Sequence, residues 1–355
     1  MFQGPRESGE SENRLYGGIS MHGHQKQVNW IISLISFLIF LTPPAAMANA
    51  GDLSAVKASM SAGKNKTIPL EKDFTLSAGY RKDDLDWNIA GDINGDNPNV
   101  LSELTWEDVE SYQVKLQGAI VWPNRIAMRG YVNYGWIFDG DNQDSDYLGD
   151  NRTFEFSRSN NNTDDGDLWD ASLAIGYPLR FGQTVLGTLT PLFGYSYHEQ
   201  NLDITDGYQT IPDLGPFPGL DSSYDTEWHG PWIGFDLRFK ARKIAAFAHR
   251  FETYFTYEYH WVDYNAEADW NLRDDFAHPK SFEHDADGNG WKIGTGFNVW
   301  LHRNWALNFN YDYQDWSIDD GRDKVYFPDG RTAKTKLNEV NWSYYALSLG
   351  VSLRF

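Results

Sequence analysis

The chain has 355 residues, of which 41% are hydrophobic and 16% aromatic, and its mean hydropathy is −0.57. This combination argues against a helical membrane protein and is typical of a membrane barrel with an apolar belt, a polar lumen and aromatic girdles. A formal net charge of −20 argues against nucleic-acid binding and favours cationic or basic partners. The lack of cysteine excludes disulfides and thiolate metal sites.

Residues 1–50 have the layout of a secretory signal peptide. The apolar run from Trp30 to Leu41 is shorter than the roughly 20 residues of a spanning helix. Ala48-Asn49-Ala50 follows as an A-x-A cleavage site, so we predict that the mature chain begins at Gly51. Met21 stands where such a peptide ordinarily starts, which makes residues 1–20 a candidate mis-called start. The alternative reading of this segment is a membrane anchor.

Residues 51–73 show no periodicity, and we expect either a periplasmic lead-in or a short plug there. From residue 74 to 355 the chain repeats segments in which large apolar side chains alternate with small or polar ones, which is the period of a β-strand. About ten such segments can be counted, an even number that suits a transmembrane barrel. Their apolar sides begin near residues 74, 112, 128, 169, 185, 233, 251, 291, 305 and 345.

The last segment is the clearest, because every odd position from Tyr345 to Phe355 is large and apolar. No sequence follows that could cover this apolar face, so lipid is its natural partner. The alternative is the last strand of a soluble sandwich. We predict an all-β fold: a transmembrane antiparallel up-and-down barrel of about ten strands with long extracellular loops, placed in the outer membrane of a Gram-negative-type bacterium.

The connections between these segments are of two kinds. Those near residues 122–125, 178–184, 241–246 and 302–304 are short, whereas those near 81–101, 139–168, 198–230, 263–290 and 317–338 are long and acidic. Short turns on one side and long loops on the other are typical of outer-membrane barrels, so function is expected in or beneath the long loops.

The polar faces of the segments carry charges of both signs. In a narrow barrel these side chains point into the lumen and should pair with one another, because unpaired buried charge is costly. A channel lining is the alternative function. The charged residues on these faces are Lys115, Arg129, Asp236, Arg238, Arg250, Glu252, Glu258 and Asp312.

Four stretches between residues 102 and 234 resemble the omptins, which are outer-membrane endopeptidases on a ten-strand barrel. Ser102-Glu103-Leu104-Thr105-Trp106 resembles their S-x-L-x-W motif, and residues 118–122 (GAIVW) resemble their G-A-I-x-W strand end. Asp144-Ser145-Asp146-Tyr147 is similar to their D-x-D-aromatic motif. Tyr224 followed by Trp228, Pro231, Trp232, Ile233 and Gly234 is similar to a fourth motif of the family.

This resemblance implies a site in which an Asp pair faces an Asp–His pair and a water between them attacks the peptide bond. The Asp pair carries over as Asp144 and Asp146. The D-x-H motif does not, because the nearest match is Asp269-Trp270-Asn271 and asparagine cannot act as a general base. His278 and His284 lie further along the same loop, and His260 lies in the wall below it. Our candidate catalytic set is Asp144, Asp146, Asp269 and His278.

Two further features bear on partners. Asp92, Asn94, Asp96 and Glu103 approach the spacing of a calcium loop, so we consider them a weak Ca²⁺ site, and no other cofactor is expected. Residues 139–146 and 285–289 offer similar acidic runs. The position that matches an arginine of the omptins' lipid A site holds Glu227, which argues against binding lipopolysaccharide in that family's manner.

Three hypotheses follow from the sequence. The first is an omptin-like barrel with an incomplete protease site, whose acidic loops form a binding or adhesive surface for basic peptides or host surface molecules. The second is a working endopeptidase that uses Asp144 and Asp146 with Asp269 and a relocated histidine, and that cleaves near basic residues. The third is a small porin.

Overall fold

A computed structural model describes residues 70–182, 186–242 and 248–355, so the predicted signal peptide lies outside the described residues. No helix in these ranges is long and apolar enough to cross a membrane. Their regular structure consists of fourteen β-strands. These are β1 (Glu71–Ile89), β2 (Ser102–Val121), β3 (Ala127–Gly149), β4 (Thr153–Asn162), β5 (Gly166–Gly176), β6 (Leu179–Phe181), β7 (Leu186–Ile211), β8 (Gly215–Pro216), β9 (Asp221–Arg242), β10 (Arg250–Asp269), β11 (Phe282–Trp300), β12 (Trp305–Ile318), β13 (Gly321–Tyr326) and β14 (Thr332–Arg354).

The strands form one antiparallel sheet that closes on itself. Its first and last long strands pair, with Phe74 of β1 opposite Leu353 of β14. Strands β4 and β5 share one place between β3 and β7, and β12 and β13 share one place between β11 and β14. Strands β6 and β8 are short additions to β7. The fourteen strands therefore occupy ten positions around the barrel, and the predicted fold class is confirmed.

Outward apolar side chains cover one half of the barrel, which we call the lower half. It runs from the short turns up to the level of Tyr80, Phe138, Tyr197 and Trp261. A membrane needs about 9–11 residues of each strand, whereas β7 has 26 and β14 has 23. The lower half is thus the part that crosses lipid. Its exposed apolar side chains include Leu76, Leu116, Val132, Leu173, Ile175, Phe193, Ile233, Leu307, Leu349 and Val351.

In the remaining upper half the apolar side chains change face. On β1, Phe74 and Leu76 point outward, whereas Leu85 and Trp87 further along the same strand point inward and are 2% exposed. The same exchange occurs on β7 and β14, where Leu202 and Trp342 are buried. The reason is the solvent, because lipid favours apolar groups outside the sheet and water favours them inside.

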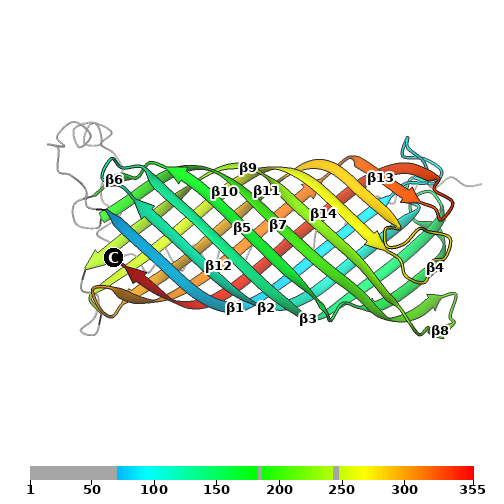
Figure 1. The fold of residues 1–355 in the computed structure, drawn as a ribbon, viewed down its shortest axis with the longest axis horizontal. Helices are drawn as coiled ribbons and strands as arrows, with labels where there is room; N and C mark the ends of the chain where they lie inside the picture. The colour runs from blue at the N-terminus through cyan, green and yellow to red at the C-terminus, as the bar shows by residue number, and fades with distance from the viewer. Residues whose placement is uncertain (1–69, 183–185, 243–247) are drawn as a thin grey trace, which may run out of the picture. The chain divides into compact units, whose positions relative to one another are not determined.

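The prediction of long loops was wrong for most of their length. Much of the sequence near 81–101, 139–168, 198–230, 263–290 and 317–338, which we expected to be irregular, extends the barrel as strands. Exposed apolar side chains in these stretches are scattered and no longer alternate along the outer face, so the lipid-facing pattern stops before the strand does. Figure 1 shows the result, with β6 and the carboxyl terminus at one end of the barrel and β4, β8 and β13 at the other.

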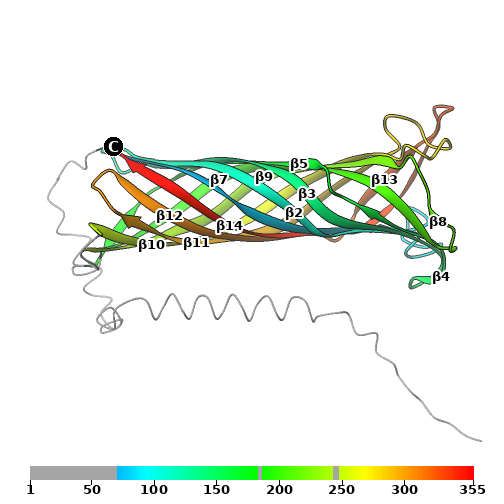
Figure 2. The same ribbon diagram turned by 90° about the horizontal axis from the view of Figure 1, so that it is seen from below.

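Figure 2 shows the same separation from a second direction, with β13, β8 and β4 at the end away from the carboxyl terminus. Short periplasmic turns and longer extracellular connections are the rule for such barrels. The upper half and its connections are therefore extracellular, and the lower end faces the periplasm.

Candidate functional site

Asp144 and Asp146 lie in the upper half of β3, two residues apart and hence on one face of the strand. Asp144 is half-buried, and its Oδ1 atom is enclosed without a hydrogen bond. Burial raises the pKa of Asp144 to about 8, and the neighbouring charge of Asp146 adds to the rise. Burial also raises the pKa of Asp146, although the Ser102 and Ser157 hydroxyls stabilise its charge.

The segment that joins β10 to β11 carries the second half of the candidate site. Strand β10 lies four positions from β3 in the ring of ten, on the opposite wall. Asp269 ends β10, and its Oδ1 lies 2.5 Å from Nδ1 of His278. This hydrogen bond raises the pKa of His278, and the backbone carbonyl of Arg273 adds to the rise. Of the three histidines that the sequence offers, His278 is thus the one that contacts Asp269.

The same segment presents a guanidinium group to the carboxylate pair. The charge of Arg273 acts to lower the pKa of both Asp144 and Asp146, and the Trp270 side chain also stabilises ionised Asp144. Two hydrogen bonds of 2.9 Å to Asp275 hold the Arg273 side chain. The charge of Arg273 therefore acts from one half of the candidate site on the carboxyl groups of the other, a feature that the sequence did not predict.

This arrangement limits the chemistry of the mouth. A histidine acts as a general base only while its imidazole is neutral, and the raised pKa of His278 favours the cationic form. Asp144, with a pKa of about 8, is mostly protonated at pH 7. The mouth thus holds a histidine whose proton is stabilised by Asp269 and, near neutral pH, a carboxyl pair that shares a proton, which suits recognition of cations better than activation of water.

The other histidines named from the sequence have internal partners. The Nδ1 atom of His284 lies 2.8 Å from the Tyr224 hydroxyl, deep in the upper half. His260 lies between the Ser196 hydroxyl, 3.1 Å from its Nδ1, and Glu258, 3.2 Å from its Nε2. All of these side chains are buried, so neither histidine is placed to serve the mouth.

The candidate calcium residues do not converge. Both carboxylate oxygens of Asp92 accept hydrogen bonds from its own turn, namely the amides of Asn94 and Asp96 and the side chain of Asn97. Glu103 accepts a hydrogen bond of 2.6 Å from Arg152. Among the residues that the structure describes, no group of three or more acidic or histidine side chains could hold a metal ion.

Aromatic side chains fill the lumen of the upper half, and we call this set the aromatic core. Trp316 and Trp342 stack with ring centroids 5.6 Å apart, and Trp106 stacks on Tyr224 at 5.0 Å. These rings are at most 1% exposed. The aromatic core disfavours a wide aqueous channel. Its main members are Trp87, Trp106, Tyr224, Trp228, Tyr264, Phe282, Trp316 and Trp342.

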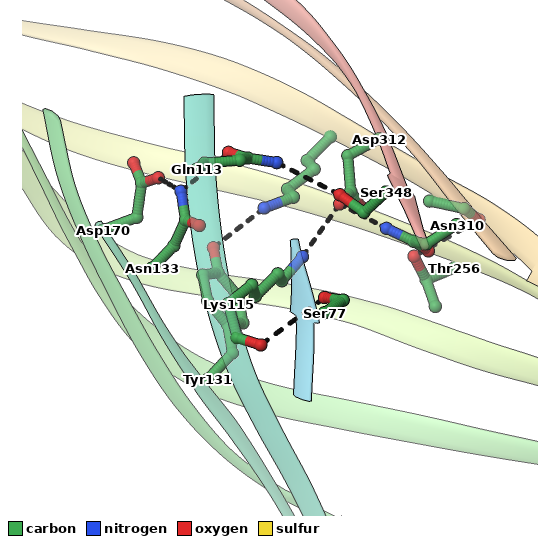
Figure 3. Close-up of polar contacts among 12 residues, drawn as sticks. Ser77, Gln113, Lys115, Tyr131, Asn133, Asp170, Thr256, Asn310, Asp312 and Ser348 are labelled. Carbon is green, nitrogen blue, oxygen red and sulfur yellow. Dashed lines mark hydrogen bonds and ion pairs between the residues drawn. The ribbon is translucent and has the colours of Figure 1, made fainter. Parts of the chain in front are cut away.

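Below the aromatic core the predicted network of paired charges is confirmed. Lys115 donates to Asp312 at 2.8 Å, and Arg129 pairs with both Asp236 and Glu258. Figure 3 shows this region, with Lys115 directed toward Asp312 and with Asn133 bonded to Asp170.

The innermost group of this network was not predicted. Arg81 binds Asp83 and Asp170 with hydrogen bonds of 2.7 Å, and Asp170 also lies 2.8 Å from Nδ1 of His198. Arg81 and His198 are the first residues of two segments that the sequence predicts as loops. A strand assignment carried two residues further would have placed both of them in the lumen.

The outer surface at the predicted lipid A position is acidic. Glu227 is exposed on β9 and lies opposite Glu199 of β7 in the register. Like charges directly opposite one another repel, so this surface does not attract an anionic headgroup. The expectation that Glu227 argues against the omptin manner of binding lipopolysaccharide stays a prediction.

A closed antiparallel barrel with an apolar belt, short turns at one end and extended strands at the other defines an outer-membrane β-barrel protein. Residues 75–355 match the family described as Pom: Protochlamydia outer membrane protein. The chain belongs to this family, and its location is the outer membrane. The search of curated proteins gave no match.

One solved structure supports the same fold. The outer membrane protease OmpT from Escherichia coli is 15% identical with a TM-score of 0.65, over 82% of this chain and 100% of OmpT. At that identity the likeness shows the fold, which confirms the omptin-like resemblance at this level. OprG from Pseudomonas aeruginosa is 11% identical over 80% of this chain and 95% of its own, with a TM-score of 0.28. The translocator domain of NalP from Neisseria meningitidis is 11% identical over 85% of this chain and 93% of its own, with a TM-score of 0.31.

Proposed function

We propose that this barrel is a cell-surface binding protein whose acidic extracellular mouth captures basic segments of polypeptides. The distribution of charge supports this most. Residues 81–110, 139–170, 199–227, 262–287 and 315–339 of the upper half carry 40 of the chain's 50 Asp and Glu residues but eleven of its 30 Lys and Arg residues. A surface of one sign raises the local concentration of ligands of the other sign and speeds their encounter.

The residues at the mouth favour binding over cleavage. Arg273 is an internal example of the ligand chemistry, since its guanidinium stabilises the charges of Asp144 and Asp146. A lysine or arginine of a partner would meet the same carboxyl groups. The hydrogen bond to Asp269 raises the pKa of His278, which favours the cationic imidazolium over the neutral imidazole that would activate a water.

Fluorescence anisotropy with a labelled peptide rich in Lys-Lys and Arg-Arg pairs tests this proposal on the barrel refolded in detergent. The double variant Asp144→Asn/Asp146→Asn should bind about tenfold more weakly, because charge-assisted contacts contribute about 1.5–3 kcal/mol. The matched control is Asp329→Asn, which removes an exposed loop carboxylate paired with Arg331. Equal binding of a peptide in which glutamate replaces every basic residue would contradict the proposal.

A second candidate is an endopeptidase of the omptin type, and the Asp269–His278 contact of 2.5 Å favours it. In this reading Asp269 orients the imidazole, His278 accepts a proton from the attacking water, and the Asp144–Asp146 pair shares a proton on the other side. Activity would rise with pH as His278 loses its proton.

Mass spectrometry of the same peptides, with and without lipopolysaccharide, distinguishes the two functions. Under the binding proposal the peptides stay intact. Cleavage that disappears in both Asp144→Asn and His278→Gln would replace the binding proposal with the enzymatic one.

A further inference from the structure

A cavity of about 80 Å³ lies in the lumen of the lower half, below the aromatic core. Its lining mixes polar and apolar groups, and it carries more positive than negative side chains. At about 10–15 Å³ for each water, it holds roughly six waters or one small oxyanion. The five cations of its lining are Lys115, Arg129, Arg238, Lys292 and Arg354, and the three carboxylates are Asp73, Glu258 and Asp312.

Each of the three carboxylates already has a cation bound to it. Asp312 accepts from Lys115 at 2.8 Å, Glu258 pairs with Arg129, and Asp73 accepts from Arg354 at 2.8 Å. Bound carboxylates of this kind repel an anion less than free ones would. Two cations of the lining, Lys292 and Arg238, remain outside these pairs.

Lys292 is the more enclosed of the two, at 3% exposed. Its ammonium group has three N–H donors, but the structure gives it one hydrogen bond, of 2.8 Å, to the Tyr131 hydroxyl. It forms no ion pair with the carboxylates of the described residues. Burying an ammonium group is costly unless its donors are satisfied, so two donors at the cavity call for an acceptor.

The surroundings of Lys292 hold charges of both signs, because its charge acts on Asp170, Glu258 and Asp312 while a second ammonium group lies close by. The ammonium nitrogens of Lys115 and Lys292 lie 4.6 Å and 4.4 Å from the centre of the same Tyr131 ring. Figure 3 shows Tyr131 and Lys115 side by side in the lumen. The closest carboxylate of Arg238 is Asp236 at 3.9 Å, and Asp236 is shared with Arg129.

From this geometry we infer that the cavity is a binding site for a small free oxyanion, with inorganic phosphate as the probe, held by Lys292, Arg238 and the Tyr131 hydroxyl. Because Tyr131 accepts from Lys292, its own proton is available for the anion. The aromatic core closes the lumen above, so the anion enters from the periplasmic end. This site is separate from the mouth, and its test does not depend on peptide binding.

Calorimetric titration of inorganic phosphate into the refolded barrel at low ionic strength tests the inference. The wild type should show saturable binding, and Lys292→Met should weaken it by about tenfold or more, because a charge-assisted contact is lost. Arg322→Gln is the matched control, since it removes an exposed extracellular cation paired with Asp285 and should leave the affinity unchanged.

Three outcomes would overturn the inference: no saturable heat with the wild type, equal affinity in Lys292→Met, or binding of glycerol 3-phosphate without binding of inorganic phosphate. The last result would assign the site to a lipid headgroup. If Lys292→Met fails to show the gel shift of a folded barrel on heating, Arg238→Gln replaces it. That side chain is 30% exposed at the cavity, and the variant should weaken phosphate binding in the same direction.

Discussion

Replacing Asp144 with asparagine should stabilise the mouth at high pH and leave it unchanged at low pH. The pKa of this carboxyl rises from 3.8 to about 8 on folding, so between these values the folded state holds a proton that the unfolded chain has lost. Stability must therefore fall as the pH rises through this window. The asparagine variant lacks this loss, because its side chain does not ionise.

The size of the effect follows from the shift. Each pKa unit corresponds to about 1.4 kcal/mol, so the full shift has an upper bound of about 5–6 kcal/mol. Asp146 shares the repulsion and solvent screens part of it, so we expect the variant to gain about 2 kcal/mol at pH 8 relative to the wild type. The gain should be near zero at pH 4 and level off above pH 8.

Hydrogen exchange read by mass spectrometry measures the local stability of the mouth, in peptides that cover residues 139–149 and 269–281. The ratio of protection between variant and wild type removes the intrinsic pH dependence of exchange. Asp141→Asn, an exposed carboxylate on the same strand, is the control and should show no such trend. A gain for Asp144→Asn that is constant from pH 4 to 9, or that shrinks as the pH rises, would refute the reasoning.

Three further outcomes are expected. In a planar bilayer the purified wild type should show no stepwise conductance, since the aromatic core fills the upper lumen; regular steps would favour the porin hypothesis instead. Trp228→Ala should lower the free energy of unfolding by about 3–5 kcal/mol, whereas Trp261→Ala on the lipid-facing surface should cost less, as measured by denaturant unfolding in micelles. By the same measurement, Asp170→Asn should lower the free energy of unfolding by about 3 kcal/mol, because it leaves Arg81 partly unpaired. Asp108→Asn breaks an exposed pair with Lys82 and should lower it by less than about 1 kcal/mol. Equal losses in the two variants would contradict the role given to the buried pair.

The lower half of the barrel could be predicted from the sequence because lipid imposes one simple rule on it. Leu347, Leu349 and Val351 alternate with small or polar residues, and the same period of two marks each spanning segment. In the upper half the apolar side chains of β1 and β7 move to the other face and are fewer, so Leu85 and Leu202 were read as parts of loops. The predicted fold class was nevertheless correct, because the closure of the barrel depends on the segments that span the membrane.

The candidate site was predictable in part. Asp144 and Asp146 share a face through their spacing alone, and Asp269 contacts His278, one of the three histidines that the sequence offers; their catalytic roles stay a prediction. The position of Arg273 could not be foreseen, because it depends on how the residues after β10 fold back over the mouth. Such a fold is set by contacts between distant segments, for example the hydrogen bond from the Ala277 amide to the Tyr326 carbonyl.

The exchange of faces along each strand also fixes the depth of the barrel in the membrane. A shift outward would move Trp261 and Tyr197 into water, and a shift inward would bring Glu199 and Glu227 into hydrocarbon, so neither displacement is tolerated. Asp144 lies six residues beyond Phe138 on β3, which places it about 15 Å above the lipid boundary at a typical strand tilt. Ligands must consequently approach the carboxyl pair from the surrounding medium, and molecules that diffuse within the bilayer plane pass beneath it.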